Sequence, residues 1–304
     1  MLGSLLVLGF VLLSAVRDVY FGHVFQSIGF FKVVLIACTI CTVFFLLVAA
    51  LRGALTVLKD NLGTVLAVNI TTAVAWILYF FALTHISPAA ANTLYSGVGP
   101  IAIVALEAVG WRIVGRGPVR RWEAIFFVGI AVSLVMIGAG AVLDLSGMAT
   151  ADIRYSAAGA VLAVLAGVSL VISILYTRKL HDRGAGSDAI LGTRFILIVI
   201  VAVAAEGFSD QKIWNFSVTD LAWLGLSGAL LIVMPIWVLQ LGIARSVPLT
   251  ANIIRALGPV VVFATQLLDP RIVFSGYTLC ALSFYAICVI GANLVRARAA
   301  LAPA

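Results

Sequence analysis

Charged residues are scarce in this chain of 304 residues, since Asp, Glu, Lys and Arg together make up 10% of it. A soluble globular domain carries about 25% charged residues and about 45–50% apolar ones. Here 63% of the residues are hydrophobic, and apolar runs long enough to cross a bilayer recur from one end to the other. The composition excludes a soluble domain and predicts an integral membrane protein.

Side chains that carry enzymatic chemistry are also few. Cys38 and Cys41 have the spacing of metal ligands or a redox pair, but they lie inside an apolar run with no His or carboxylate nearby, so we interpret them as packing residues. The sequence contains neither an HExxH pattern nor a phosphate-binding loop with Gly, Lys and Ser or Thr. A membrane enzyme would need clustered carboxylates or histidines at an interface. We therefore expect no enzyme, no ATPase, no metal and no cofactor.

The apolar runs predict an all-α integral membrane protein with ten transmembrane helices. Helices are required because backbone groups in lipid must be paired internally, and the runs are too continuous for the alternating strands of a barrel. The predicted spans are 3–23, 30–51, 61–84, 88–109, 122–143, 156–177, 188–207, 220–243, 247–268 and 274–296.

The positions of Lys and Arg predict the orientation of these spans. With the N-terminus in the cytosol, the loops and tail on the cytosolic side hold 12 basic residues and the opposite loops hold 3. Lys and Arg are retained on the cytosolic side, so both termini are predicted to be cytoplasmic. The net charge of +7 thus reflects membrane topology, and we expect no nucleic-acid partner because no basic cluster lies on a soluble face.

Two segments of the chain resemble each other. Residues 82–92 continue to Gly99-Pro100, and residues 242–252 continue to Gly258-Pro259. The prolines and asparagines of these segments correspond, Pro88 with Pro248 and Asn92 with Asn252. The repeated unit is then five helices, residues 1–150 and residues 151–304, and an odd number of spans requires the second copy to be inverted in the membrane. Inverted repeats are typical of transporters that work by alternating access.

The repeat also indicates where a solute could bind. Helices interrupted at equivalent places in two halves favour a substrate site, so Gly99, Pro100, Gly258 and Pro259 are candidate hinge residues. Arg17 and Asp18 lie together near the outer end of the first span and are predicted to form a salt bridge with other helices or a gate. The side chains predicted to bind substrate share helical faces that should turn away from lipid: Trp76, Tyr79, Asn92, Tyr95, Ser96, Trp237, Gln240, Asn252 and Arg255.

The intramembrane arginines indicate the kind of solute. A buried Arg255 with asparagine donors suits a carboxylate, and aromatic and aliphatic walls suit an apolar side chain, so an amino acid or a related amphiphile would satisfy both. An organic-anion or phosphorylated-metabolite antiporter is the alternative, given Arg17, Arg194 and Arg255. Arg194 is also expected to lie close enough to the surface to snorkel. Proton coupling and uniport both stay open, with Asp18 and Glu107 as the candidate proton carriers.

These features resemble the drug/metabolite transporter superfamily. The passages that end at Pro100 and Pro259 are similar to its EamA-type repeat, and so is the basic residue early in the second helix of each half, Lys32 and Arg194. The resemblance implies two inverted five-helix bundles around a central cavity, export of amino acids or other metabolites, and a location in the bacterial inner membrane. Within the superfamily, the YddG-type aromatic amino acid exporters are the closest comparison.

Overall fold

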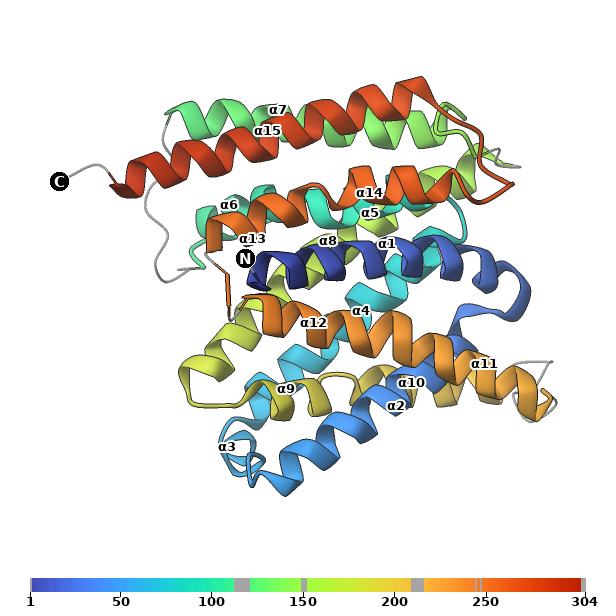
Figure 1. Cartoon of the computed structure of the whole chain (residues 1–304), viewed down its shortest axis with the longest axis vertical. Helices are drawn as coiled ribbons and strands as arrows, with labels where there is room; N and C mark the ends of the chain where they lie inside the picture. The colour runs from blue at the N-terminus through green and yellow to red at the C-terminus, as the bar shows by residue number, and fades with distance from the viewer. Residues whose placement is uncertain are drawn as a thin grey trace.

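The computed structural model describes residues 2–111, 121–148, 152–208, 216–243, 245–246 and 248–301. Every regular element within these ranges is helical (Figure 1). The helices are α1 (Leu2–Ile28), α2 (Phe30–Leu51), α3 (Thr56–Lys59), α4 (Leu62–Leu83), α5 (Pro88–Gly97), α6 (Gly99–Ala108), α7 (Arg121–Val142), α8 (Ile153–Asp182), α9 (Ser187–Thr193), α10 (Ile196–Gly207), α11 (Val218–Gly228), α12 (Met234–Ile243), α13 (Pro248–Ala256), α14 (Gly258–Gln266) and α15 (Gly276–Leu301).

Nine segments of the described chain are long and apolar enough to cross a membrane. They include α5 with α6 as one segment, α9 with α10 as another, and α11 with the first part of α12 as a third, joined by a π-helical turn over Ala229–Val233. The predicted span 247–268 corresponds to α13 and α14, of which Ile253–Gln266 is a shorter apolar helix. A multi-pass membrane protein is therefore confirmed.

The predicted spans match these helices closely, except for their continuity. The sequence predicted interruptions at Gly99-Pro100 and Gly258-Pro259, and α6 and α14 do begin at these glycines. The spans 188–207 and 220–243 were predicted as unbroken. The structure instead separates α9 from α10 at Arg194 and Phe195 and places the π-helical turn before α12. Neither site contains a Gly-Pro pair, so local sequence carried no signal for these irregularities.

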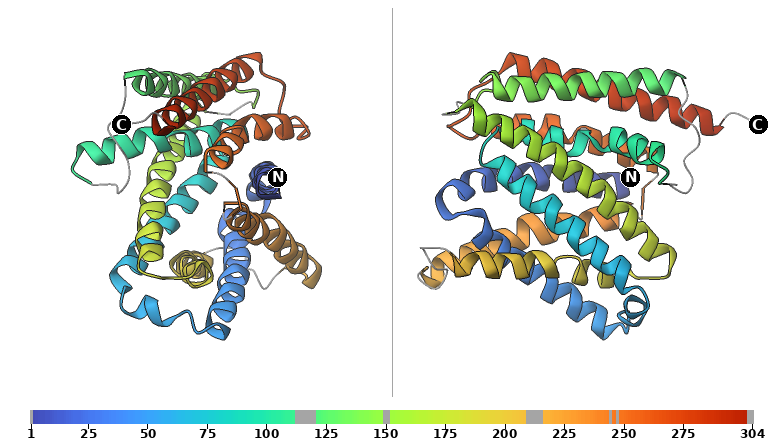
Figure 2. Two further views of the ribbon diagram at one scale, coloured as in Figure 1. Left: turned by 60° about the vertical axis from the view of Figure 1, so that its left-hand side comes forward. Right: turned by 180° about the vertical axis from the view of Figure 1, so that it is seen from behind.

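Helices from the two parts of the chain pack against each other throughout the molecule. Helix α4 packs on α8, α1 on α12 and α14, α2 on α9 and α10, α5 on α8 and α14, and α7 on α15. Figure 2 shows the α4 and α8 pair from behind, and Figure 1 shows α7 and α15 side by side. Small residues allow such close approaches: a methyl group at Gly140 of α7 would come within 2.5 Å of the Tyr277 ring on α15.

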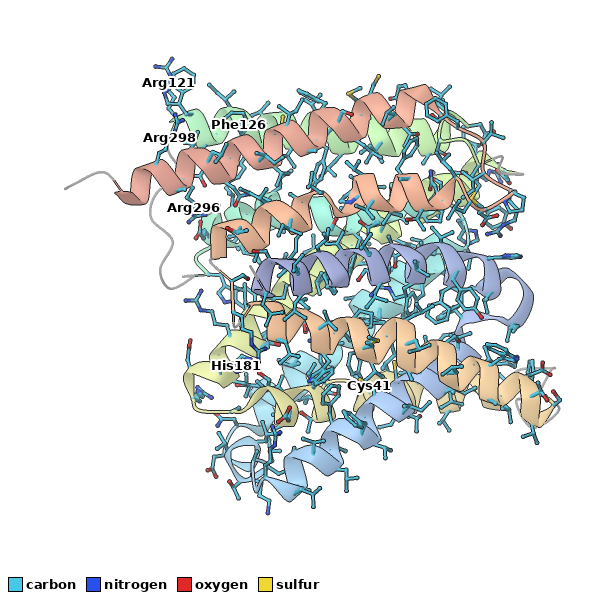
Figure 3. The ribbon with its side chains drawn as sticks, viewed as in Figure 1. Cys41, Arg121, Phe126, His181, Arg296 and Arg298 are labelled. Atoms are coloured by element: carbon cyan, nitrogen blue, oxygen red, sulfur yellow. The ribbon has the colours of Figure 1, made fainter. Side chains whose placement is uncertain are left out.

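The first and last helices run in opposite directions, and this bears on topology (Figure 1). Helix α1 begins, and α15 ends, toward the same side of the molecule in both figures. Figure 3 places Arg121, Arg296, Arg298 and His181 at this same end, and it places Cys41 near the middle of the helices. Basic side chains thus collect at the end where the chain enters the bundle.

Candidate functional site

Three apolar helical segments are interrupted near their centres, and each interruption has a polar side chain beside it. Helix α5 starts with Pro88 in its first turn, and the Ser87 hydroxyl accepts a hydrogen bond from the Ala90 backbone N–H (3.4 Å). It ends at Gly97, so Tyr95 and Ser96 occupy its last turn, directly before the break at Val98.

The other two breaks carry arginines. Arg255 is the second residue before the break at Leu257 that separates α13 from α14. Arg194 is the C-cap residue of α9, at the break before α10. Since proline removes a backbone donor and clashes with the preceding turn, Pro259 accounts for the break beside Arg255. No proline lies at the break beside Arg194.

Arg17 and Asp18 form an ion pair with each other, whereas the sequence predicted salt bridges from them to other helices, and both are buried in α1. The Arg17 Nε and a terminal nitrogen each lie 2.8 Å from Asp18 Oδ1. Asn92 of α5 donates from its side-chain nitrogen to Asp18 Oδ2 at 2.7 Å. The Tyr79 hydroxyl of α4 also hydrogen-bonds with Asp18 and lies 3.5 Å from the Asn92 nitrogen. One carboxylate thus connects three helices.

Aromatic rings surround this ion pair. The rings of Tyr79 and Tyr95 are stacked, with centroids 4.2 Å apart. The Arg17 guanidinium lies 5.7 Å from the ring centroid of Trp76, within the range of a cation–π interaction. Trp76 in turn packs edge-to-face on Phe195, which adjoins the break between α9 and α10 (5.4 Å between centroids). These contacts join the Asp18 pair to the break that carries Arg194.

Arg194 does not snorkel to the surface, contrary to the expectation from its sequence position. Its guanidinium donates to the hydroxyls of Thr72 on α4 and Ser173 on α8, both at 3.3 Å, and these two hydroxyls are 2.8 Å apart. The Nε atom is buried and has no hydrogen-bond partner among the described residues. Arg194 points into the bundle because the break after α9 turns its side chain toward α4 and α8.

Arg255 has different surroundings from Arg17. More than a third of its side-chain surface is exposed, although it lies near the centre of its segment. Its charge interacts with the hydroxyls of Tyr95 on α5 and Tyr285 on α15. Tyr285 also hydrogen-bonds with Ser96. No carboxylate of the described chain pairs with Arg255, so its donors are free to bind an anion.

Tyr95 is the residue on which these contacts converge. Its hydroxyl interacts electrostatically with Arg17, Arg194, Arg255 and Asp18. Gly167 makes this arrangement possible, because a β-carbon there would collide with the Tyr95 backbone carbonyl. Helix α8 therefore approaches α5 directly beside the site. The sequence selected Tyr95 but not this convergence.

The structure brings together most, but not all, of the predicted site residues. Trp76, Tyr79, Asn92, Tyr95, Ser96, Arg17, Asp18 and Arg255 belong to the contacts described above. Trp237 of α12 is 51% exposed, as are in part Met234 of the same helix and Leu230 of the preceding π-helical turn, and it is not joined to this group. The side chains of Gln240 and Asn252 lie outside the described residues.

Four polar residues of the site were missed by sequence reasoning. Thr72, Ser173 and Tyr285 hold the arginines or their neighbours, and Gln266 of α14 accepts a hydrogen bond from the Ala89 backbone N–H of α5 (2.9 Å). Isolated hydroxyls in apolar helices occur widely as interhelical hydrogen bonds, so they gave no signal. Gln266 had one weak signal, because it follows Gly258-Pro259 in the sequence as Glu107 follows Gly99-Pro100.

The site offers cationic and aromatic side chains but no metal ligands. Among the described residues, no three His, Cys, Asp or Glu side chains gather closely enough to hold a metal ion. The arrangement is suited to bind a small anion by charge-assisted hydrogen bonds beside aromatic rings.

Comparison with known proteins identifies the fold and no more. No family model matches the chain. No curated protein matches it either. A solved structure described only as a crystal structure of a protein superimposes with a TM-score of 0.63 at 18% identity, over 97% of this chain and 95% of the other. The same fold therefore exists in a protein of distant sequence, over nearly its whole length.

Proposed function

We propose that this protein is a secondary transporter that exports a small carboxylate-bearing solute, such as an amino acid or a related amphiphilic metabolite, by alternating access. The observation that carries the proposal is the convergence of Arg17, Arg194 and Arg255 on Tyr95 from three different spans. The resemblance of the sequence to EamA-type drug/metabolite transporters agrees with it. The proposed location is the bacterial inner membrane, with both termini cytoplasmic.

The proposed topology has an even number of crossings. In this proposal α13 and α14, interrupted at Leu257, supply the tenth crossing beside the nine apolar spans. Helix α1 begins and α15 ends toward the same side, which an even number of crossings requires. Arg121, Arg296 and Arg298 lie at that end, as retention of basic residues in the cytosol predicts (Figure 3).

The packing of the helices supports inverted halves. If the first half is matched to the second in chain order, α1 corresponds to α8, α4 to α11 and α12, and α5 to α13. Exchange of the halves then turns the α1–α12 contact into α8–α4, and α1–α13 into α8–α5; all four contacts occur. The α2–α9 and α7–α15 contacts pair equivalent helices with each other, and the α5–α14 contact joins the two corresponding segments that carry a Gly-Pro break. Two such halves can rock about these shared contacts and expose the site to each side in turn.

The surroundings of Arg255 favour a carboxylate as the group that is bound. A guanidinium at the centre of a bilayer costs about 3 kcal/mol or more unless it is paired or hydrated. Exposure of Arg255 beside Tyr95 and Ser96 is consistent with a hydrated space between the helices. A carboxylate can replace that water with two parallel hydrogen bonds, and the tyrosine rings provide an apolar wall.

The balance of charge favours the second candidate, an organic-anion or phosphorylated-metabolite antiporter. Three arginines interact with Tyr95, against one carboxylate, Asp18. Both oxygens of Asp18 already accept hydrogen bonds, from Arg17 and Asn92. A zwitterionic amino acid would have to displace one of these donors to place its ammonium group there, whereas an anion would not.

Replacement of Arg255 by Met tests the binding role. A hydrogen bond to a charged group contributes about 1.5–3 kcal/mol, so the variant should bind carboxylated solutes at least about tenfold more weakly. Ligand-induced thermal stabilisation of the purified protein measures this for a panel of amino acids, dicarboxylates and sugar phosphates. Arg154→Met, at an exposed position at the start of α8, is the matched control.

Uptake into proteoliposomes decides between the two candidates. If amino acids but not dianions inhibit the uptake of a carboxylated solute, the result supports amino acid transport. The reverse pattern supports the anion antiporter. Unchanged binding and uptake of every carboxylated solute by the Arg255→Met variant would contradict both.

A further inference from the structure

A polar cavity lies at one end of the helices, away from Tyr95. Its volume is about 350 Å³, and it is lined by Asp60, Asn61, Leu62, Gly63, Thr64, Ala67, Tyr176, Lys179 and Arg183. These residues come from the start of α4 and the end of α8, together with the turn after α3. The cavity therefore lies at the level where a helix end meets the surface of a bilayer.

Two cationic side chains reach this cavity. Arg183 donates from one terminal nitrogen to the Asn61 side-chain oxygen and lies 3.5 Å from the Thr64 hydroxyl. These contacts hold the guanidinium in place and leave several of its five N–H groups for a ligand. Lys179, one helical turn earlier in α8, has no partner among the described residues and is exposed. A fixed guanidinium next to a free ammonium is suited to bind a phosphate.

The start of α4 adds further donors on the same side. The Asn61 amide does not cap the helix, because its oxygen accepts from Arg183 and its nitrogen donates to the Val57 carbonyl (2.9 Å). The space beside Gly63 is open, with no heavy atom within 4 Å of where a β-carbon would stand. The backbone N–H groups of Leu62 and Gly63 can therefore contribute to the same anion, whereas those of Thr64 and Val65 donate to the Asn61 carbonyl.

An apolar stripe runs from the cavity along α4. Leu62, Leu66, Ile70 and Val74 follow one another at four-residue intervals, and they are 67%, 57%, 45% and 39% exposed. A free phosphate would need only the polar cavity, whereas a phospholipid would also place its acyl chains on such a stripe. The continuity of the cavity with the stripe favours the lipid.

We propose that this cavity binds the headgroup phosphate of a membrane phospholipid through Lys179 and Arg183, with the acyl chains along the exposed stripe of α4. The carboxylate of Asp60 also lines the cavity, so its walls carry charges of both signs. A headgroup with an ammonium beside its phosphate, as in phosphatidylethanolamine, matches both signs. An anionic headgroup such as phosphatidylglycerol matches only the basic residues. The site is therefore expected to prefer phosphatidylethanolamine.

Native mass spectrometry of the full-length protein in detergent, with each phospholipid added in turn, tests the proposal. A basic side chain near anionic lipid contributes about 1 kcal/mol, so Lys179→Gln should weaken binding of both lipids about fivefold. Arg178→Gln is the matched control, since Arg178 is exposed on the same turn of α8 and does not line the cavity. Equal affinity of wild type and Lys179→Gln, or an equal loss in the control, would overturn the site.

Two further measurements identify the ligand. Asp60→Asn should weaken binding of phosphatidylethanolamine and strengthen that of phosphatidylglycerol, and a uniform effect on both would contradict the role of Asp60. Displacement of bound lipid by an equal concentration of glycerol phosphate would overturn the lipid assignment in favour of a soluble phosphate. Melting temperatures equal to that of the wild type verify that each variant is folded.

Discussion

Arg17 and Arg255 both lie within apolar helical segments, and the structure surrounds them in opposite ways. Arg17 is buried, adjoins its carboxylate partner Asp18 and lies over the Trp76 ring. Arg255 is exposed, faces two tyrosines and has no carboxylate partner within the described chain. The guanidinium of Arg17 therefore holds helices together, whereas that of Arg255 stays available to bind an anion.

The difference follows from how each charge is compensated. A buried ion pair is tolerated in a medium of low polarity when further hydrogen bonds satisfy its remaining atoms, as Asn92 and Tyr79 do for Asp18. A single charge at such a depth must be hydrated or bind an ion of opposite sign. We infer that Arg17 and Asp18 stabilise the α1–α4–α5 contact, and that Arg255 binds solute.

Asp18→Asn should cause the largest loss of stability, because it removes the carboxylate that pairs with the buried Arg17. Removing one partner of a buried ion pair costs about 3–5 kcal/mol, since the other charge is left uncompensated. The melting temperature of the purified variant should therefore fall well below that of wild type. Arg255→Met, by contrast, should leave the melting temperature nearly unchanged.

The double variant Arg17→Met, Asp18→Asn removes both charges of the pair. It should recover much of the stability lost in Asp18→Asn, because no uncompensated charge remains. Equal melting temperatures for Asp18→Asn and Arg255→Met would remove the distinction between the two arginines.

Thr72→Val should cause an intermediate loss of stability. Arg194 has two hydroxyl partners, whereas Arg17 has a carboxylate partner and Arg255 has none within the described chain. The substitution removes a hydroxyl that contacts both Arg194 and Ser173, and a buried donor that loses its partner costs about 1–3 kcal/mol. Thr71→Val is the matched control, since the Thr71 hydroxyl bonds to Ala67 and Val68 carbonyls of its own helix. A stability loss in Thr71→Val as large as in Thr72→Val would show that Arg194 needs no support from Thr72.

The ion pair of Asp269 and Arg271 lies in the turn between α14 and α15. We expect it to contribute least to the stability of the folded protein. Hydrogen bonds from the Arg271 side chain, together with its charge, lower the pKa of Asp269 below its ordinary value of 3.8. A carboxyl group with a lowered pKa stabilises the folded state at neutral pH, and this contribution disappears as pH falls through the lowered pKa. Because Arg271 is partly exposed, the pair should contribute about 0.5–1 kcal/mol.

The comparison of wild type with Asp269→Asn measures this contribution. The difference in melting temperature should be constant from neutral pH to about pH 5, and it should shrink below about pH 4 as the carboxylate becomes protonated. A difference that grows at acidic pH would contradict the assignment.

Parts of the site could be predicted because their signals were local. Gly-Pro pairs predicted the breaks at Val98 and Leu257, and polar residues at helical spacing selected Asn92, Tyr95 and Ser96. The same reasoning selected Trp237, which lies on an exposed stripe of α12, because spacing along one helix does not tell which side faces other helices. Thr72 escaped notice because both of its partners, Ser173 and Arg194, are more than 100 residues away in the sequence.

The sequence by itself determined that this chain spans a membrane many times as helices. Twenty-residue apolar runs have no other stable form in lipid, where every backbone polar group must be paired within its own segment. Only the tertiary structure decided which charges are compensated and which are available. Arg17, Arg194 and Arg255 look alike in sequence, and their roles differ because packing supplies a carboxylate to the first, two hydroxyls to the second and open space to the third.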